Sequence, residues 1–140
     1  MAAYTHRNAV MFQHCDPAGI VFYPRYYEMI NAAIEHFFDE ALDWPWRIMH
    51  GQERLGVPMG RITTDFQAPS RLGDWLDWSL DIRRVGGASL DLDIRATGED
   101  GVLRVTAEAT LVLVDLDRMK SRRWPDDKRA RLQSFMEDAA

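Results

Sequence analysis

Cysteine is nearly absent from the sequence, which has Cys15 alone among its 140 residues. A lone cysteine cannot form an intrachain disulfide, so nothing points to an oxidising compartment. Long apolar runs are absent as well: no stretch approaches the length that crosses a membrane, and the first residues contain no apolar signal core. We therefore expect a cytoplasmic protein without a membrane partner.

An excess of positive charge is also missing, because 17 lysines and arginines stand against 22 aspartates and glutamates, for a formal net charge of −5. Nucleic-acid-binding proteins carry a basic surface, so we expect no nucleic-acid partner. An anionic ligand would need a local basic patch, for which Arg83, Arg84 and the basic run from Lys120 to Arg131 are the candidates. Most of these side chains are expected to be solvated surface charge.

Motifs for metals and nucleotides do not occur in the sequence. There is no HExxH, P-loop or GxGxxG segment. His6, His36 and His50 lack the paired spacing with acidic residues that a metal site requires. We therefore expect no metal ion and no cofactor.

The composition is that of an ordinary globular protein. Hydrophobic residues make up 46% and charged residues 28% of the chain, which is far from the pattern of a disordered segment. A chain of 140 residues is long enough to build one hydrophobic core, and no repeat or linker divides it. The expected organisation is a single domain over residues 1–140.

The first third of the sequence predicts a short strand and a long helix. Residues 7–13 are typical of a strand, which the turn formers from Asp16 to Gly19 end. Pro24 suits the first position of a helix, and the apolar residues after it recur every three or four positions: Tyr27, Ile30, Ile34, Phe37, Phe38 and Ala41. A short helical or irregular stretch through Arg54 follows. The long helix is therefore expected to bury one face.

The second half of the sequence has the two-residue alternation of strands. Strands are predicted at 60–68, 76–83, 90–97 and 102–117, and a terminal helix at 125–138. The last strand is apolar on both faces in its second half, so we expect that half to have contacts on each side. One long helix followed by antiparallel strands predicts an α+β fold, in which the sheet wraps around the helix.

The segment from His14 to Pro24 contains the residues best suited to catalysis. It places the carboxylate of Asp16 in a tight loop before a helix N-terminus, where free N–H groups and the helix dipole can polarise a carbonyl oxygen. Pro24 has no N–H, so the backbone N–H of Tyr23 is the expected donor. A carboxylate can attack an acyl carbon or deprotonate water, and a thioester suits it because a thiolate leaves without strong acid assistance.

Other interpretations of the same segment remain open. Asp16 could merely cap the Asp-Pro turn and the helix behind it. His14 would share a face with Asp16 on a strand and could pair with it, although a structural histidine is the simpler interpretation. Cys15 would point away from Asp16 and is expected to be a buried thiol rather than a nucleophile.

The segment from Val10 to Trp46 resembles the 4-hydroxybenzoyl-CoA thioesterase family of hot-dog proteins. The shared motif is Asp-Pro-Ala-Gly-Ile-Val at residues 16–21, followed by an aromatic-proline pair and the long helix. Residues 64–69 with Gly73-Asp74 look like the family's first central strand and the turn after it. The resemblance implies a five-stranded antiparallel sheet around the helix and a homo-oligomer, a dimer or tetramer, with active sites between subunits.

The resemblance also implies roles for individual residues. It makes Asp16 the catalytic nucleophile or general base, and it makes the backbone N–H of Tyr23 the donor to the thioester carbonyl. Five further residues fall at positions that contact the substrate in this family: Pro17, Gly19, Ile20, Asn31 and Ser89.

The sequence departs from the family at residues 86–88, where Gly-Gly-Ala replaces basic residues suited to the phosphates of coenzyme A. Either other basic residues hold the nucleotide, or the thioester is not borne by coenzyme A.

Phe22, Tyr26 and Tyr27 favour an aromatic acyl group. The expected function is hydrolysis of an aromatic, 4-hydroxybenzoyl-CoA-like acyl-CoA to free acid and coenzyme A. The alternatives are a short-chain acyl-CoA or acyl carrier protein thioesterase, a non-catalytic acyl-CoA-binding protein, and a hot-dog dehydratase or interaction-only dimer.

Overall fold

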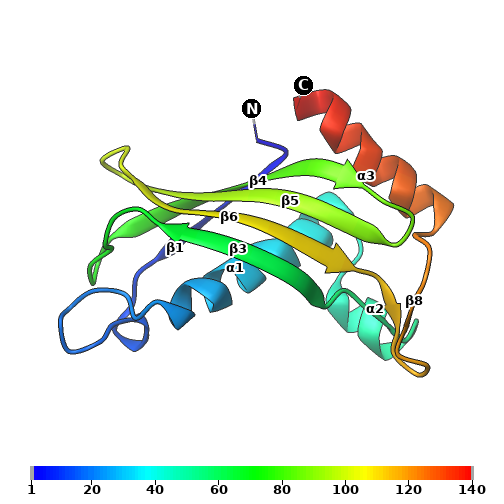
Figure 1. Ribbon diagram of the computed structural model, residues 1–140, viewed down its shortest axis with the longest axis horizontal. Helices are drawn as coiled ribbons and strands as arrows, with labels where there is room; N and C mark the ends of the chain where they lie inside the picture. The colour runs from blue at the N-terminus through cyan, green and yellow to red at the C-terminus, as the bar shows by residue number, and fades with distance from the viewer. Residues whose placement is uncertain (1, 140) are drawn as a thin grey trace.

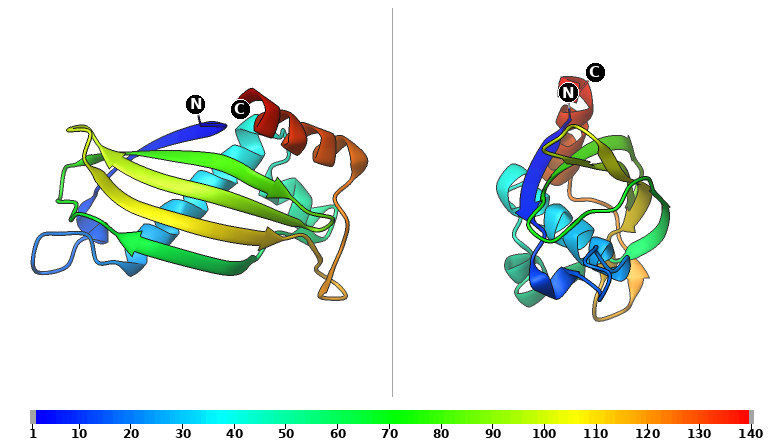
Figure 2. Two further views of the ribbon diagram at one scale, coloured as in Figure 1. Left: turned by 45° about the horizontal axis from the view of Figure 1, so that its top comes forward. Right: turned by 90° about the vertical axis from the view of Figure 1, so that its left-hand side faces the viewer.

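A curved sheet of five antiparallel strands forms the body of the protein (Figure 1). The computed structural model describes the backbone of residues 2–139 and the side chains of residues 2–136. The strands are β1 (Tyr4–Ala9), β3 (Met59–Phe66), β4 (Trp75–Val85), β5 (Ser89–Gly98) and β6 (Leu103–Val112), and they lie in the order β1-β4-β5-β6-β3. Figure 2 shows the sheet curled around the helix α1 (Pro24–His36). The predicted α+β fold, a five-stranded antiparallel sheet around a long helix, is confirmed.

The central helix α1 follows from its apolar spacing. Pro24 lies in its first turn, as predicted, and the side chains that face the sheet are buried: Tyr26, Met29, Ile30, Ala33 and Ile34. A wider π-helical turn, η2 (Phe37–Ala41), continues this face with two buried phenylalanines. In the first turn the buried tyrosine is Tyr26, whose hydroxyl donates a hydrogen bond to Ser70 Oγ at 2.9 Å, whereas the predicted Tyr27 is half-buried. One apolar stripe therefore packs against the inside of the sheet.

Burial confirms the two-residue alternation of the sheet. The inward-facing side chains are buried: Leu76, Trp78, Leu80 and Ile82 on β4, and Leu90, Leu92, Ile94 and Ala96 on β5. These side chains and the apolar stripe of α1 belong to one hydrophobic core. The strand period alone therefore decides which face of the sheet meets the helix.

The first strand begins and ends earlier than predicted. Because β1 pairs with β4 over its whole length and stops at residue 9, the prediction of a strand over residues 7–13 is wrong in its second half. The chain then turns into the short 3-10 helix η1 (Phe12–His14), where the N–H of Met11 donates to His14 Nδ1 at 2.8 Å. A side chain that satisfies the backbone locally competes with strand pairing. This turn leads the chain into the Asp16 loop.

The predicted strand over residues 102–117 is shorter in the structure, because β6 ends at Val112. The chain then enters a separate small sheet that consists of β2 (Leu55–Gly56), β7 (Val114–Asp115) and β8 (Lys120–Ser121). Asp115 Oδ1 accepts the N–H groups of Asp117 and Arg118, each at 3.0 Å, and so closes the turn after β7. The apolar side chains between the two sheets are buried or half-buried, which agrees with the expected contacts on both faces.

Two further helices, α2 (Trp46–Gly51) and α3 (Asp126–Ala139), agree in position with the predicted helical segments. In α3, Leu132 is buried and Phe135 is half-buried against the core. Figure 1 shows α3 at the opposite end of the sheet from the loop that precedes α1. Among residues 2–139, no helix is both long enough and apolar enough to cross a membrane.

Two stacked histidines join β1 to α1. The rings of His6 and His36 lie 4.4 Å apart with an angle of 21° between their planes. Glu40 lies beside them, 3.5 Å from His36 Nδ1, and accepts a hydrogen bond from the Tyr4 hydroxyl at 2.6 Å. Burial, and secondarily the charge of His36, lower the pKa of His6, whereas Glu40 opposes this shift.

We expect acid to destabilise the protein through His6. Because its folded-state pKa is lowered, the folded protein binds fewer protons than the unfolded chain, and the stabilisation is complete above about pH 6.5 and is lost as the pH falls through the folded-state pKa. His6→Phe keeps an aromatic ring but cannot titrate. The fall in Tm between about pH 7.5 and about pH 5.5 should therefore be smaller in this variant. Burial also lowers the pKa of His14. His14 therefore contributes to the fall in Tm that remains in the variant. An unchanged fall would contradict the prediction.

Candidate active site

The loop that carries Asp16 is a small closed hairpin. The N–H of Gly19 donates to the Asp16 carbonyl at 2.9 Å, and the N–H of Asp16 donates to the Ile20 carbonyl at 3.0 Å. Gly19 adopts a φ of +78°, a backbone conformation that residues with a side chain adopt at a cost, so this glycine allows the hairpin to close. The N–H of Val21 continues the pairing to the Ser70 carbonyl at 2.9 Å. Together with the bridge between Ile20 and Arg71, this bond anchors the loop to the segment before β4.

Asp16 is a half-buried residue of this hairpin. Its Oδ1 accepts the N–H of Ala18 at 2.9 Å, as expected for an aspartate that caps a turn. No described residue donates a hydrogen bond to the second oxygen, Oδ2. The turn-capping interpretation therefore accounts for one carboxylate oxygen and leaves the other available for chemistry.

The backbone N–H of Tyr23 lies at the start of α1. The neighbouring N–H groups are bonded: that of Phe22 donates to the His14 carbonyl at 2.9 Å, and that of Arg25 donates to the Phe22 carbonyl at 2.8 Å. The Tyr23 N–H has no acceptor among the described residues. A free N–H at the positive end of a helix is the kind of donor that stabilises a carbonyl oxygen as negative charge develops on it.

Aromatic side chains surround the start of α1. The ring of Phe66, at the end of β3, lies 5.9 Å from the rings of Tyr23 and Tyr26 and 6.4 Å from that of Tyr27. Most of the exposed large apolar side chains belong to segments at this end of the sheet: Met11, Phe12, Phe22, Tyr23, Phe66, Leu72, Trp75 and Val102. Exposed apolar groups gathered in this way typically mark a surface that binds a ligand or a partner.

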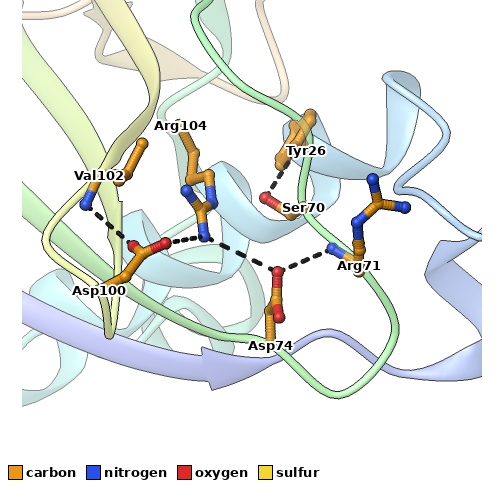
Figure 3. Close-up of polar contacts among 7 residues, drawn as sticks. All are labelled: Tyr26, Ser70, Arg71, Asp74, Asp100, Val102 and Arg104. Atoms are coloured by element: carbon orange, nitrogen blue, oxygen red, sulfur yellow. Dashed lines mark hydrogen bonds and ion pairs between the residues drawn. The ribbon is translucent and has the colours of Figure 1, made fainter.

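Polar side chains gather around residues 70–74, the segment with which the Asp16 hairpin pairs (Figure 3). Ser70 is fully buried, and Arg104 has only 8% of its surface exposed. The guanidinium of Arg104 lies 3.1 Å from Asp100 Oδ2 and 3.9 Å from Asp74 Oδ2. The hydrogen bond from the Val102 N–H is the main cause that holds the pKa of Asp100 below its usual value, and the hydrogen bond from Arg104 is the second. The sequence does not point to Arg104 as a buried residue, because strand alternation predicts an outward side chain at this position.

Residues 10–132 of the chain match the family described as the Thioesterase-like superfamily. The chain belongs to that superfamily. Acyl-CoA thioester hydrolase YbgC of Escherichia coli O6:H1 is 29% identical over 122 residues, which cover 83% of this chain and 85% of that protein. The predicted membership of the hot-dog thioesterase family is therefore confirmed, and it supports the prediction of a thioester hydrolase.

Solved structures of thioesterases share the fold of this superfamily member. A gentisyl-coenzyme A thioesterase superposes with a TM-score of 0.82 at 26% identity, covering 90% of this chain and 99% of that chain. A mutant 4-hydroxybenzoyl-CoA thioesterase complexed with 4-hydroxybenzoyl-CoA superposes with a TM-score of 0.84 at 24% identity, covering 92% of this chain and 97% of that chain. The five-stranded sheet around α1 is therefore the fold of known thioesterases.

The remaining predicted substrate contacts lie in different places. Pro17, Gly19 and Ile20 belong to the Asp16 hairpin itself. Asn31 is exposed on α1 and lines a separate hollow of about 220 Å³ with residues of α2 and β3, among them Trp46 and Met59. The structure thus brings three of these residues together with Asp16 and leaves Asn31 further along the helix.

Ser89 lies at the opposite end of the sheet from the Asp16 loop. It begins β5, whose other end, Gly98, pairs with Leu76 beside that loop. A strand of 10 residues is about 30 Å long at about 3.3 Å per residue. Within one chain, Ser89 and Asp16 therefore cannot contact the same thioester group.

The two neighbours of Asp16 in sequence have structural surroundings. His14 Nδ1 is occupied by the Met11 N–H, which agrees with the structural histidine interpretation. Cys15 is half-buried rather than fully buried, and its thiol lies 3.6 Å from the Met11 carbonyl. Among the residues whose side chains are described, no group of three or more His, Cys, Asp or Glu is arranged to hold a metal ion.

The candidate anion-binding arginines fall into two groups. Arg83 is engaged on the outer face of the sheet, 3.8 Å from Asp93 and 3.3 Å from Glu108. Arg123 is exposed and lies beside the turn between β4 and β5, where a Cβ on Gly87 would be 3.5 Å from its Nη1. A basic group therefore stands next to the turn whose own residues, 86–88, carry no charge.

Proposed function

We propose that the protein hydrolyses acyl-CoA thioesters, with Asp16 as the nucleophile or general base. The observation that carries the proposal is the placement of the Asp16 carboxylate, with one oxygen free of described donors, in the hairpin before the N-terminus of α1. The unbonded N–H of Tyr23 stands at the same helix end. Membership of the thioesterase-like superfamily supports the reaction class.

Two chemical routes are open to this arrangement. In the first, a carboxylate oxygen of Asp16 attacks the acyl carbon, the carbon–sulfur bond breaks, and the thiolate leaves; water then hydrolyses the acyl anhydride. In the second, Asp16 takes a proton from a water molecule that attacks the same carbon. In both, the Tyr23 N–H donates to the carbonyl oxygen as it becomes negatively charged.

An aromatic acyl group is the substrate class that we propose. The cluster of Phe22, Tyr23, Tyr27 and Phe66 offers ring faces and edges at the start of α1. The two thioesterase structures described above are named for gentisyl-CoA and 4-hydroxybenzoyl-CoA, which carry aromatic acyl groups. Asn31 remains a proposed acyl-pocket residue.

A homo-oligomer with sites between subunits would explain the position of Ser89. Because one chain holds Ser89 and Asp16 at opposite ends of the sheet, a second copy of the chain could bring its Ser89 to the substrate that is bound at Asp16. Arg123, next to the turn between β4 and β5, would then supply positive charge for the phosphates of coenzyme A. The cytoplasm stays the expected compartment.

Thiol release from a panel of thioesters tests this function. We expect rapid release from benzoyl-CoA or 4-hydroxybenzoyl-CoA, slower release from short-chain and long-chain acyl-CoA, and little release from an acylated acyl carrier protein. A preference for short-chain acyl-CoA or for the carrier protein would overturn the substrate class and keep the reaction. Binding of acyl-CoA without any thiol release would favour the second candidate, a binding protein in which Asp16 only caps its turn, as the Ala18 hydrogen bond allows.

A further inference from the structure

Arg104 owes its buried position to an irregularity in β6. The pairing of β5 with β6 shifts between Ala96 and Thr97: Ala96 pairs with Val105, but Thr97 pairs with Leu103. Arg104 is thus the extra residue of a β-bulge, and a bulge can turn a side chain away from the face that alternation predicts. Regular alternation would place Arg104 opposite to the buried Val105, yet both residues are buried.

The space for the guanidinium is closely limited. A Cβ on Gly98 would lie 2.6 Å from Arg104 Nη2 and 2.8 Å from Asp100 Oδ1, so a side chain at this position would displace the ion pair. Nη2 reaches Asp100 on one side and Asp74 on the other, while the Nε–H of Arg104 has no acceptor among the described residues. A buried cation with an unused donor is an expensive way to stabilise a fold.

The contacts of Asp74 connect this cation to the Asp16 hairpin. Its Oδ2 accepts the N–H of Arg71 at 2.8 Å, and Arg71 forms a bridge with Ile20 of the hairpin. The backbone of Arg104 contacts the chain just before this segment, because its carbonyl accepts the N–H of Gln67 at 2.8 Å. Figure 3 shows the contacts that run from Arg104 to Asp74 and from Asp74 to Arg71.

We propose that Arg104 is a positioning residue for Asp16: through Asp74, it fixes the segment of residues 70–74 on which the Asp16 hairpin is paired. The inference rests on the proposed thioesterase function for its kinetic part. Arg104 does not touch the reacting atoms. It sets the placement of a loop whose carboxylate must meet an acyl carbon within a narrow range of distance.

Kinetics of Arg104→Gln and Asp74→Asn, singly and combined, test the proposal. We expect each single variant to lower kcat for the best thioester of the panel by about 100-fold, with KM changed by less than about threefold. Because both act through one contact, the double variant should lose no more than either single variant. Arg104→Lys, which restores a cation, should recover part of kcat. Arg7→Gln is the matched control: Arg7 also pairs with two carboxylates, Asp77 and Glu99, but on the exposed face of β1.

Several outcomes would overturn the proposal. Additive losses in the double variant would show that Arg104 and Asp74 act independently, which contradicts a shared path to Asp16. Values of kcat like that of Arg7→Gln would show that the pair contributes only to stability. A raised KM with kcat intact would show that Arg104 acts on substrate binding. Amide hydrogen exchange of Val21, whose N–H donates to the Ser70 carbonyl, distinguishes failure of the positioning proposal from failure of the proposed thioesterase function. If wild type releases no thiol, faster exchange in Arg104→Gln still supports the positioning role, and unchanged exchange overturns it.

Discussion

Replacing Asp16 with asparagine should lower kcat for the preferred thioester by about 1,000-fold, within the range of 100- to 10,000-fold that a positioned acid or base typically contributes. Asparagine retains a side-chain oxygen that can accept the Ala18 N–H, which is the bond that closes the turn. It loses the negative charge needed to attack an acyl carbon or to deprotonate water. The fold should therefore remain while the chemistry is lost, which thiol release and thermal unfolding of the same preparation would show.

Asp115→Asn is a matched control for this substitution. Asp115 also caps a turn, with Oδ1 accepting the N–H groups of Asp117 and Arg118, but it lies in β7 and outside the main sheet. We expect this variant to retain kcat within about threefold of wild type. If Asp16→Asn behaves like Asp115→Asn while wild type is active, Asp16 is only a turn cap and another group must drive the reaction.

Replacing Trp78 with alanine should lower the free energy of unfolding by about 3–5 kcal/mol, as is typical when a buried aromatic side chain is removed. Trp78 has 0% of its surface exposed and lies on β4 between β1 and β5. Its Nε1–H donates to Asn8 Oδ1 at 2.6 Å, and its ring meets that of Tyr26 edge-on at 6.4 Å. The variant therefore leaves a cavity and an amide oxygen without its donor. Denaturant unfolding measures the loss.

Trp75→Ala removes the same side chain from the same strand at an exposed position. Trp75 has 41% of its surface exposed, and the Arg7 guanidinium lies 4.7 Å above its ring. Losing this cation–π contact should cost about 1 kcal/mol or less. Comparable losses for the two variants would contradict the assignment of the core to the inner face of β4.

Local patterns in the sequence were sufficient for most of the fold. The alternation from Leu76 to Ile82 determines which face of β4 is buried, because the strand period of two is a property of the chain itself. The three- and four-residue spacing after Pro24 determines the buried stripe of α1 in the same way, apart from the choice between Tyr26 and Tyr27. The closed turn at residues 16–19 follows from turn-forming residues in sequence.

Only the tertiary structure decided the features that depend on pairing between distant segments. The bulge that buries Arg104 arises from the register between β5 and β6, and no local sequence pattern predicts a register shift. The separation of Ser89 from Asp16 follows from the length and direction of β5 within the sheet. The early end of β1 depends on its alignment with β4. Periodicity is set by neighbours along the chain, whereas register, burial of a single cation and distance across a sheet are set by contacts between residues far apart in sequence.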